Sequence, residues 1–323
     1  MKSITVLLLL LLSAPGCRLQ PHIPVPGREV QPVTSHAGFE FSPELRTLKV
    51  GPTERGRSHK KFRLEFDSDH KTHPENDRVH AECYFPARNS GKTAGILVFP
   101  ILSGGEPLSR GLGKALARAG FVALVLDQKE ELFDPETADM KFTDAVLRQS
   151  VSDARKAITW LEQRDDVDPD RIGCVGISMG GILACLVDAV ETRVKASAWL
   201  LAGGDLLEIL AVTREPGIRK ARKNWLKTSG TTVEKFLEEN RGKLNGPLKY
   251  ATHIDPAHVM MVTATFDKVI PRANADRLFE ATGRPARRFV PLGHFTALMA
   301  YPFSKRWVVK FFREEFLRAG GAE

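Results

Sequence analysis

One serine stands between two apolar segments in the stretch Asp170–Val187, which reads DRIGCVGISMGGILACLV. Ser178 is the centre of the pattern Gly-x-Ser-x-Gly, with glycines at 176 and 180. At a sharp turn between a strand and a helix the flanking backbones come close together, so glycines avoid a clash and the serine hydroxyl stands clear of the sheet. The five-residue pattern alone is weak, but here it follows a predicted strand and precedes a predicted helix. We therefore interpret Ser178 as a nucleophile rather than as a serine that caps a glycine-rich turn.

Two further residues could activate this serine. A serine hydroxyl is a weak nucleophile unless a base accepts its proton and a third group orients the base. His294, in VPLGHFTAL, follows the last predicted strand, and Asp267, in VTATFDKVIP, ends the strand before it. Each could by itself be an ordinary loop or capping residue. Because the carboxyl ends of parallel strands meet at one edge of a sheet, we expect the three side chains to lie together there.

The identity of the orienting acid has an alternative. Asp205 follows WLLAGG at the end of another predicted strand of the same sheet. Asp267 is favoured because it follows its strand directly, whereas Asp205 comes after two glycines and leads into a long insertion.

The elements that must position these residues alternate regularly from Ala94 onward. Short apolar runs, typical of parallel strands covered on both faces, occur at 94–100, 121–127, 171–177, 194–204, 258–267 and 286–294. Helical segments lie between and after them, at 108–120, 142–164, 180–190, 272–283 and 304–320; the one at 180–190 is apolar almost all round. This alternation predicts an α/β fold with a doubly wound, mostly parallel sheet. Upstream, residues 46–50, 59–69 and 79–87 alternate polar and apolar residues, which predicts antiparallel strands.

A basic, helix-prone insertion at about 205–253 interrupts the alternation. Between Arg214 and Lys243 it holds nine Lys or Arg residues and four Asp or Glu residues. Both of its ends lie at the catalytic edge of the predicted sheet, so we expect a cap over the site. Its apolar underside is expected to come from Trp225, Leu226, Phe236 and Leu237. The alternative is a peripheral helical decoration.

The N-terminus is expected to direct export. A basic residue at Lys2, an apolar run from Ile4 to Leu12 and small residues before Cys17 indicate a signal peptide over residues 1–16. Cys17 resembles a lipobox cysteine, which would become the lipidated N-terminus of an envelope protein secreted across a bacterial inner membrane; ordinary cleavage after Gly16 is the alternative. Residues 17–43 lack periodicity and predict a tether, followed by a domain at 44–323.

Composition argues against several other classes of function. The 323 residues carry a net charge of +8, but the cations are not interleaved with aromatic residues as a nucleic-acid stacking platform requires, so no nucleic-acid partner is expected. The four cysteines fit neither a disulfide framework nor the spacing of a metal site, so no metal is expected.

Three phrases of the sequence resemble the α/β-hydrolase superfamily, and within it dienelactone-hydrolase-like and acetyl-xylan-esterase-like serine hydrolases. They are VDPDRIGCVGISMGG, DKVIPRANADRLF and PLGHFTAL, and the resemblance extends from about Ala94 to the C-terminus. It implies an acyl-serine mechanism without a cofactor, with Ser178 as nucleophile, His294 as general base and acid, and Asp267 as orienting acid.

One segment departs from the superfamily pattern. Relatives usually carry His-Gly after the first parallel strand, where this chain has VFPILSGG. By the pattern, the oxyanion donors would be the backbone N–H groups of Met179 and Leu102, because Pro100 has no N–H.

The sequence as a whole predicts a carboxylic-ester hydrolase that acts on small-molecule esters and is held at the membrane by a lipid anchor. The alternatives are an oligopeptidase-like peptide hydrolase and a non-catalytic envelope binding protein on a hydrolase fold. An oligopeptidase of this kind would be expected to carry a preceding propeller-sized domain, which this sequence does not contain.

Overall fold

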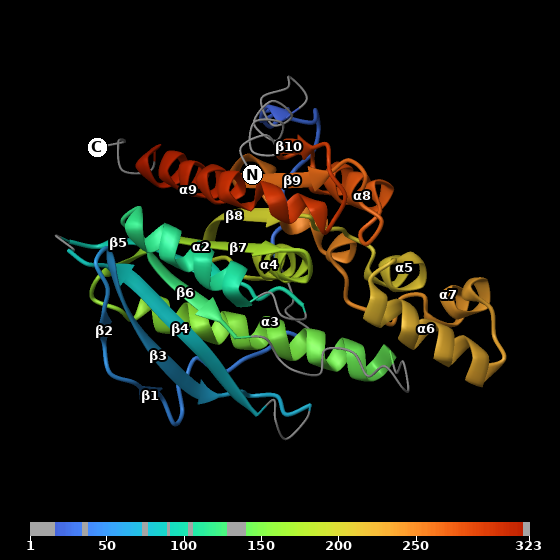
Figure 1. Cartoon of the computed structure of the whole chain (residues 1–323), viewed down its shortest axis with the longest axis horizontal. Helices are drawn as coiled ribbons and strands as arrows, with labels where there is room; N and C mark the ends of the chain where they lie inside the picture. The colour runs from blue at the N-terminus through green and yellow to red at the C-terminus, as the bar shows by residue number, and fades with distance from the viewer. Residues whose placement is uncertain are drawn as a thin grey trace.

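A central sheet organises the chain (Figure 1). The computed structural model describes residues 17–33, 38–72, 77–88, 91–102, 106–127 and 140–318. Within them the sheet has ten strands: β1 (Lys49–Val50), β2 (Glu54–Arg55), β3 (His59–Asp67), β4 (Arg78–Pro86), β5 (Thr93–Val98), β6 (Val122–Leu126), β7 (Val167–Ile177), β8 (Val194–Leu200), β9 (Val259–Ala264) and β10 (Ala286–Val290).

The strand order is β1-β3-β4-β6-β5-β7-β8-β9-β10, with β2 paired to β3. The pairs β1–β3, β2–β3, β3–β4 and β4–β6 are antiparallel. All pairs from β6 through β5 to β10 are parallel. The prediction of a mostly parallel sheet with N-terminal antiparallel strands is confirmed.

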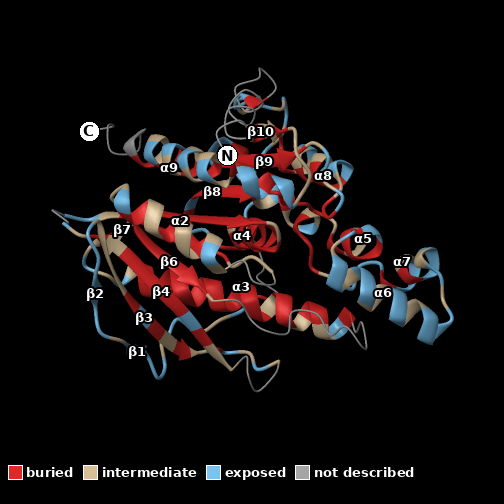
Figure 2. Cartoon of the chain, in the orientation of Figure 1, coloured by how far each residue is buried: buried red, intermediate tan, exposed pale blue. Residues whose placement is uncertain are grey.

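Helices cover both faces of the sheet. They are α2 (Glu106–Arg118), α3 (Met140–Glu162), α4 (Met179–Val190), α8 (Arg272–Thr282) and α9 (Tyr301–Arg318). Leu116 of α2 and Phe312 of α9 belong to one apolar core, and Ile158 of α3, Leu186 of α4 and Leu278 of α8 belong to the other. The central strands are buried on both sides, as their continuous apolar sequences predict (Figure 2). No helix among the described residues is long and apolar enough to span a membrane.

The insertion forms three further helices, α5 (Leu206–Val212), α6 (Pro216–Ser229) and α7 (Val233–Asn240), which project from one end of the sheet (Figure 1). None of the residues of α6 is buried. Asn245, after α7, ties the insertion back to the domain because its backbone N–H donates to Asp144 Oδ1 at 2.8 Å.

The segment expected to be a tether contacts the domain at several of its described residues. Gln20 and Arg287 exchange two backbone hydrogen bonds, and Arg28 donates to the carbonyl of Ile254. Phe39 is fully buried in the core. The structure therefore differs from the expectation of a free tether, because this aperiodic segment still supplies an aromatic side chain and backbone partners for the domain.

Candidate active site

Ser178 occupies the turn between β7 and α4 in a strained conformation. Its φ is 58° and its ψ is −121°, a backbone conformation that residues other than glycine rarely adopt. A Cβ at Gly176 would lie 2.0 Å from the carbonyl oxygen of Gly180, and a Cβ at Gly180 would lie 2.5 Å from that of Pro100. The two glycines therefore permit the close approach that turns the Ser178 hydroxyl out of the sheet.

The structure brings Ser178, His294 and Asp267 into one line of hydrogen bonds. Ser178 Oγ lies 2.8 Å from His294 Nε2, and His294 Nδ1 lies 2.7 Å from Asp267 Oδ2. The side chain of Asp267 is 3% exposed and that of His294 is 9% exposed. This arrangement allows the imidazole to accept the serine proton while the carboxylate stabilises the imidazolium that forms.

Backbone contacts fix the two loops that carry the acid and the base. Asp267 Oδ1 accepts hydrogen bonds from the N–H groups of Val269 and Ile270, each at 2.8 Å. Phe266 N–H donates to the carbonyl of Leu292 at 3.0 Å, which joins the loop after β9 to the loop after β10. The parallel pairing of β9 with β10 thus places Asp267 beside His294.

Asp205, the alternative acid, has another role in the structure. Its side chain accepts a hydrogen bond from Glu208 N–H at 3.0 Å and caps the N-terminus of α5. The orienting position at His294 is held by Asp267.

The N-terminus of α4 lies directly after Ser178, beside the site. Ser178 N–H donates to the carbonyl of Leu200 at 2.8 Å, so this group is already used. Met179 is the first residue of α4, and N–H groups in the first turn of a helix have no intrahelical acceptor. Leu102 lies in the wall of the same cavity. The positions of Met179 and Leu102 suit the two backbone donors expected from the sequence pattern.

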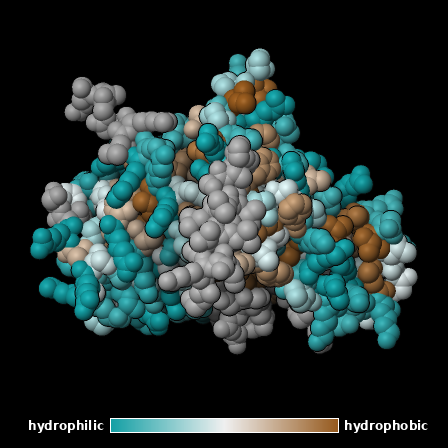
Figure 3. Space-filling model, turned by 45° about the horizontal axis from the view of Figure 1, so that its top comes forward, coloured by the Kyte–Doolittle hydropathy of each residue, from teal (hydrophilic) through white to brown (hydrophobic). Residues whose placement is uncertain are grey.

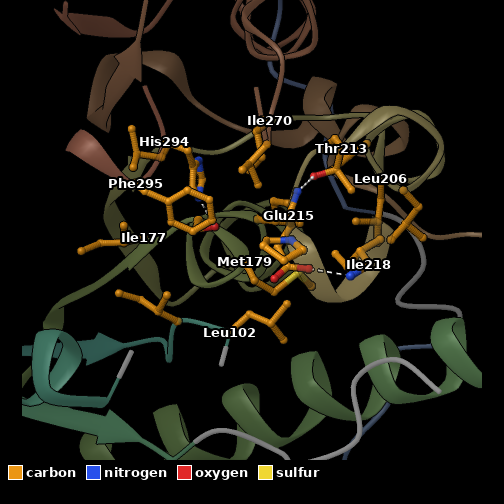
Figure 4. A pocket seen from close by; sticks show the side chains of 18 of the residues that line it. Leu102, Ile177, Met179, Leu206, Thr213, Glu215, Ile218, Ile270, His294 and Phe295 are labelled. Carbon is orange, nitrogen blue, oxygen red and sulfur yellow. Dashed lines mark hydrogen bonds between the residues drawn. The ribbon is translucent and has the colours of Figure 1, made fainter. Parts of the chain in front are cut away.

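An apolar cavity of ≈ 350 Å³ opens at Ser178 and His294 (Figure 4). This volume lies near the lower end of the range of about 300–1,000 Å³ found for small-ligand sites. Its described walls come from the loop after β5, from α2, from the start of α4, from α5 and α6, and from the loops after β9 and β10. They include Ile101, Leu102, Leu108, Met179, Ile182, Leu206, Ile209, Leu210, Pro216, Ile218, Val269, Ile270, Phe295 and Leu298.

The insertion contributes to these walls through other residues than the sequence suggested. Leu210 of α5 and Ile218 of α6 line the cavity. Trp225 and Phe236 instead pack against each other, with ring centroids 4.5 Å apart, and so join α6 to α7. The surface on the right of Figure 3, where the insertion lies, is mainly hydrophilic with a group of hydrophobic side chains among the hydrophilic ones.

One charged residue of the cavity was missed by the sequence analysis. Glu215 lies among the apolar side chains that line the cavity (Figure 4). Its Oε2 accepts a hydrogen bond from Ile218 N–H at 2.6 Å, and its own N–H donates to Thr213 Oγ1 at 3.1 Å. The sequence holds one signal for this position, since an acid directly before Pro216 is typical of a helix N-terminus.

Comparisons with known proteins agree with this architecture. Residues 79–208 match the Dienelactone hydrolase family. A Bradyrhizobium sp. protein described as "Probable 2-oxo-3-(5-oxofuran-2-ylidene)propanoate lactonase" is 30% identical over 102 residues, which are 30% of this chain and 41% of that protein. The chain thus spans about two fifths of the length of the first curated relatives it matches.

Solved structures show the same fold across most of the chain. An acetyl xylan esterase from Paenibacillus sp. R4 superposes with a TM-score of 0.64 at 16% identity, over 84% of this chain and 89% of that one. Acetyl xylan esterase 1 from Thermoanaerobacterium sp. JW/SL YS485 superposes with a TM-score of 0.60 at 16% identity, over 84% and 88%. The chain therefore shares the fold of these esterases, and its residues 79–208 match the Dienelactone hydrolase family.

Proposed function

We propose that the protein is a serine hydrolase that cleaves small carboxylic esters through an acyl-serine intermediate. The observation that supports this most is the hydrogen-bonded line Ser178–His294–Asp267 at the mouth of an apolar cavity. The family match and the fold shared with esterases favour the same reaction class.

In the first half of the reaction, Ser178 Oγ attacks the ester carbonyl while His294 Nε2 accepts its proton. The carbonyl oxygen becomes an oxyanion, which the N–H groups of Met179 and Leu102 would stabilise together with the N-terminal dipole of α4. His294 then donates its proton to the departing alkoxide. The alcohol leaves and the acyl group stays on Ser178.

In the second half, water attacks the acyl-enzyme and His294 accepts a proton from this water. The tetrahedral intermediate collapses, His294 returns the proton to Ser178 Oγ, and the carboxylic acid is released. Asp267 holds the same imidazole tautomer throughout, because Nδ1 must keep its proton to donate to the carboxylate. Ser178, His294 and Asp267 can together carry out every proton transfer of the cycle.

The test is replacement of Ser178 by Ala. We expect ester turnover to fall by at least about three orders of magnitude, since removal of a triad nucleophile has that effect. Labelling by a fluorophosphonate probe should be lost as well, with the circular dichroism spectrum unchanged. Turnover near that of the wild type in a folded Ser178→Ala protein would show that Ser178 is only a turn residue.

A further inference from the structure

The described wall of the cavity contains an acidic residue but no lysine or arginine. This wall is apolar except for Ser178, His294, Thr213 and Glu215. Thr213 is fully buried and its hydroxyl accepts from Glu215 N–H. Apart from the catalytic groups, the described wall of the cavity thus contains one carboxylate, that of Glu215.

The position of this carboxylate is fixed from two sides. Glu215 Oε2 accepts from Ile218 N–H at 2.6 Å, and Thr213 holds the Glu215 backbone at 3.1 Å. A carboxylate that accepts such a hydrogen bond at a helix N-terminus is stabilised in its charged form by the helix dipole. Glu215 therefore presents a carboxylate at a fixed position in the cavity wall.

No described cation of the insertion lines the cavity, although Arg222 of α6 donates to the backbone carbonyls of Leu210 and Thr213 behind its wall. Arg219, Lys220, Lys223 and Lys227 of α6 are exposed, and none of them lines the cavity. Charges that are exposed to water are screened over a distance of about 8 Å at physiological salt, whereas a charge inside an apolar cavity is screened much less. A ligand in the cavity is consequently affected more by Glu215 than by the basic surface outside.

We propose that Glu215 determines substrate specificity and makes this site select esters with neutral groups over esters that carry a carboxylate. This inference rests on the proposed function, because it names the substrate class of the same site. A substrate carboxylate in the cavity would meet a fixed like charge and no lysine or arginine among the described residues of the cavity wall. A neutral, apolar substituent would meet the isoleucine and leucine side chains.

The experiment compares two pairs of substrates that differ mainly in charge. In the first pair the acyl group carries the difference: p-nitrophenyl isocaproate against the p-nitrophenyl monoester of succinate. In the second pair the leaving group carries it: p-isopropylphenyl acetate against p-carboxyphenyl acetate. For each pair the ratio of kcat/KM for the anionic ester to that for the neutral ester is measured in the wild type and in Glu215→Gln.

Glutamine keeps an acceptor oxygen for Ile218 N–H and removes only the charge. We expect Glu215→Gln to raise the ratio by about tenfold in at least one pair. This is the effect expected of removing the repulsion between two like charges a few ångströms apart in a partly solvated cavity. Glu215→Ser, which also caps a helix well, should shift the ratio in the same direction. Glu238→Gln removes an equal charge from an exposed site on α7 and should leave both ratios unchanged.

Unchanged ratios for both pairs in folded Glu215→Gln and Glu215→Ser would overturn the proposal and leave Glu215 as a helix cap. A helix cap alone would change stability and total rate, but it would not change the anionic-to-neutral ratio. Failure of the wild type to hydrolyse the neutral esters would instead contradict the proposed function, so the two failures are distinguishable.

Discussion

Asp267 uses its two oxygens for different partners, and this division makes its role testable. Oδ2 faces His294 Nδ1, and Oδ1 accepts from two backbone N–H groups. In Asp267→Asn the backbone donors would keep the amide oxygen, so the amide NH₂ would face the imidazole and favour the wrong tautomer. We expect kcat/KM for a neutral ester to fall by about four orders of magnitude.

Asp205→Asn is the matched control for this prediction. Asparagine caps helices as well as aspartate does, so the variant should keep α5 and lose less than about tenfold in kcat/KM. Purified, folded variants that showed the reverse ranking would transfer the orienting role to Asp205.

The sequence supplied the candidate triad because each member has a local signature. Ser178 lies in a short pattern with a mechanical reason, and Asp267 and His294 each directly follow an apolar strand. Glu215 has only the signature of a helix N-terminus, an acid directly before Pro216, and this does not place it in a cavity. Its place in the cavity depends on how the insertion is held on the domain, and this involves contacts between segments far apart in the chain, such as that of Asn245 with Asp144.

At the scale of elements, α6 is the helix whose contribution to the cavity the sequence described least well. Ile218 and Trp225 are both partly buried residues of α6 with apolar side chains. Only Ile218 lines the cavity, whereas Trp225 packs against Phe236 of α7. A helical period alone cannot separate these two kinds of contact, since both residues lie on the apolar side of the same amphipathic helix.

This division predicts that the two residues control different properties. Ile218→Ala should enlarge the cavity and favour longer acyl chains. One methylene in an apolar pocket changes kcat/KM by roughly tenfold or more, so the preference for a longer over a shorter p-nitrophenyl ester should shift by about that factor. Trp225→Ala should lower the melting temperature and leave the chain-length preference as in the wild type. Equal chain-length profiles for Ile218→Ala and the wild type would argue that α6 is peripheral to the site.

At the scale of the whole molecule, the sheet was the most predictable feature and the N-terminal segment the least. Continuous apolar strands can be recognised locally, because burial on both faces demands them. The segment from Cys17 to Pro43 has no such periodicity, yet Phe39 is buried in the core and Gln20 pairs with Arg287 of β10. Single contacts of this kind leave no repeating pattern in the sequence.

The N-terminal segment also bears on where the protein resides. The predicted signal peptide, residues 1–16, lies outside the described residues. Cys17 itself is 2% exposed, and its carbonyl oxygen accepts a hydrogen bond from Arg288. The guanidinium of Arg288 lies over the Trp307 ring, 4.3 Å from the ring centroid. We propose that the chain is exported, cleaved before Cys17 and lipidated there. Acyl chains on Cys17 would move its side chain out of this buried position. The hydrogen bonds of Gln20 and Arg28 would still hold the following residues against the domain.

Two or more acyl chains bind a bilayer stably, whereas a single chain binds only marginally. We therefore expect the mature protein in the membrane fraction of a bacterial host, with a diacylated or triacylated Cys17 as the first residue by mass spectrometry of the N-terminal peptide. Cys17→Ser should remove this modification and move the protein to the soluble fraction. Ester hydrolysis should be retained, because Cys17 takes no part in the hydrogen-bonded line of Ser178, His294 and Asp267. An unmodified thiol at the N-terminus of the wild-type protein, or a mature chain that begins elsewhere, would leave ordinary secretion as the explanation of the apolar run.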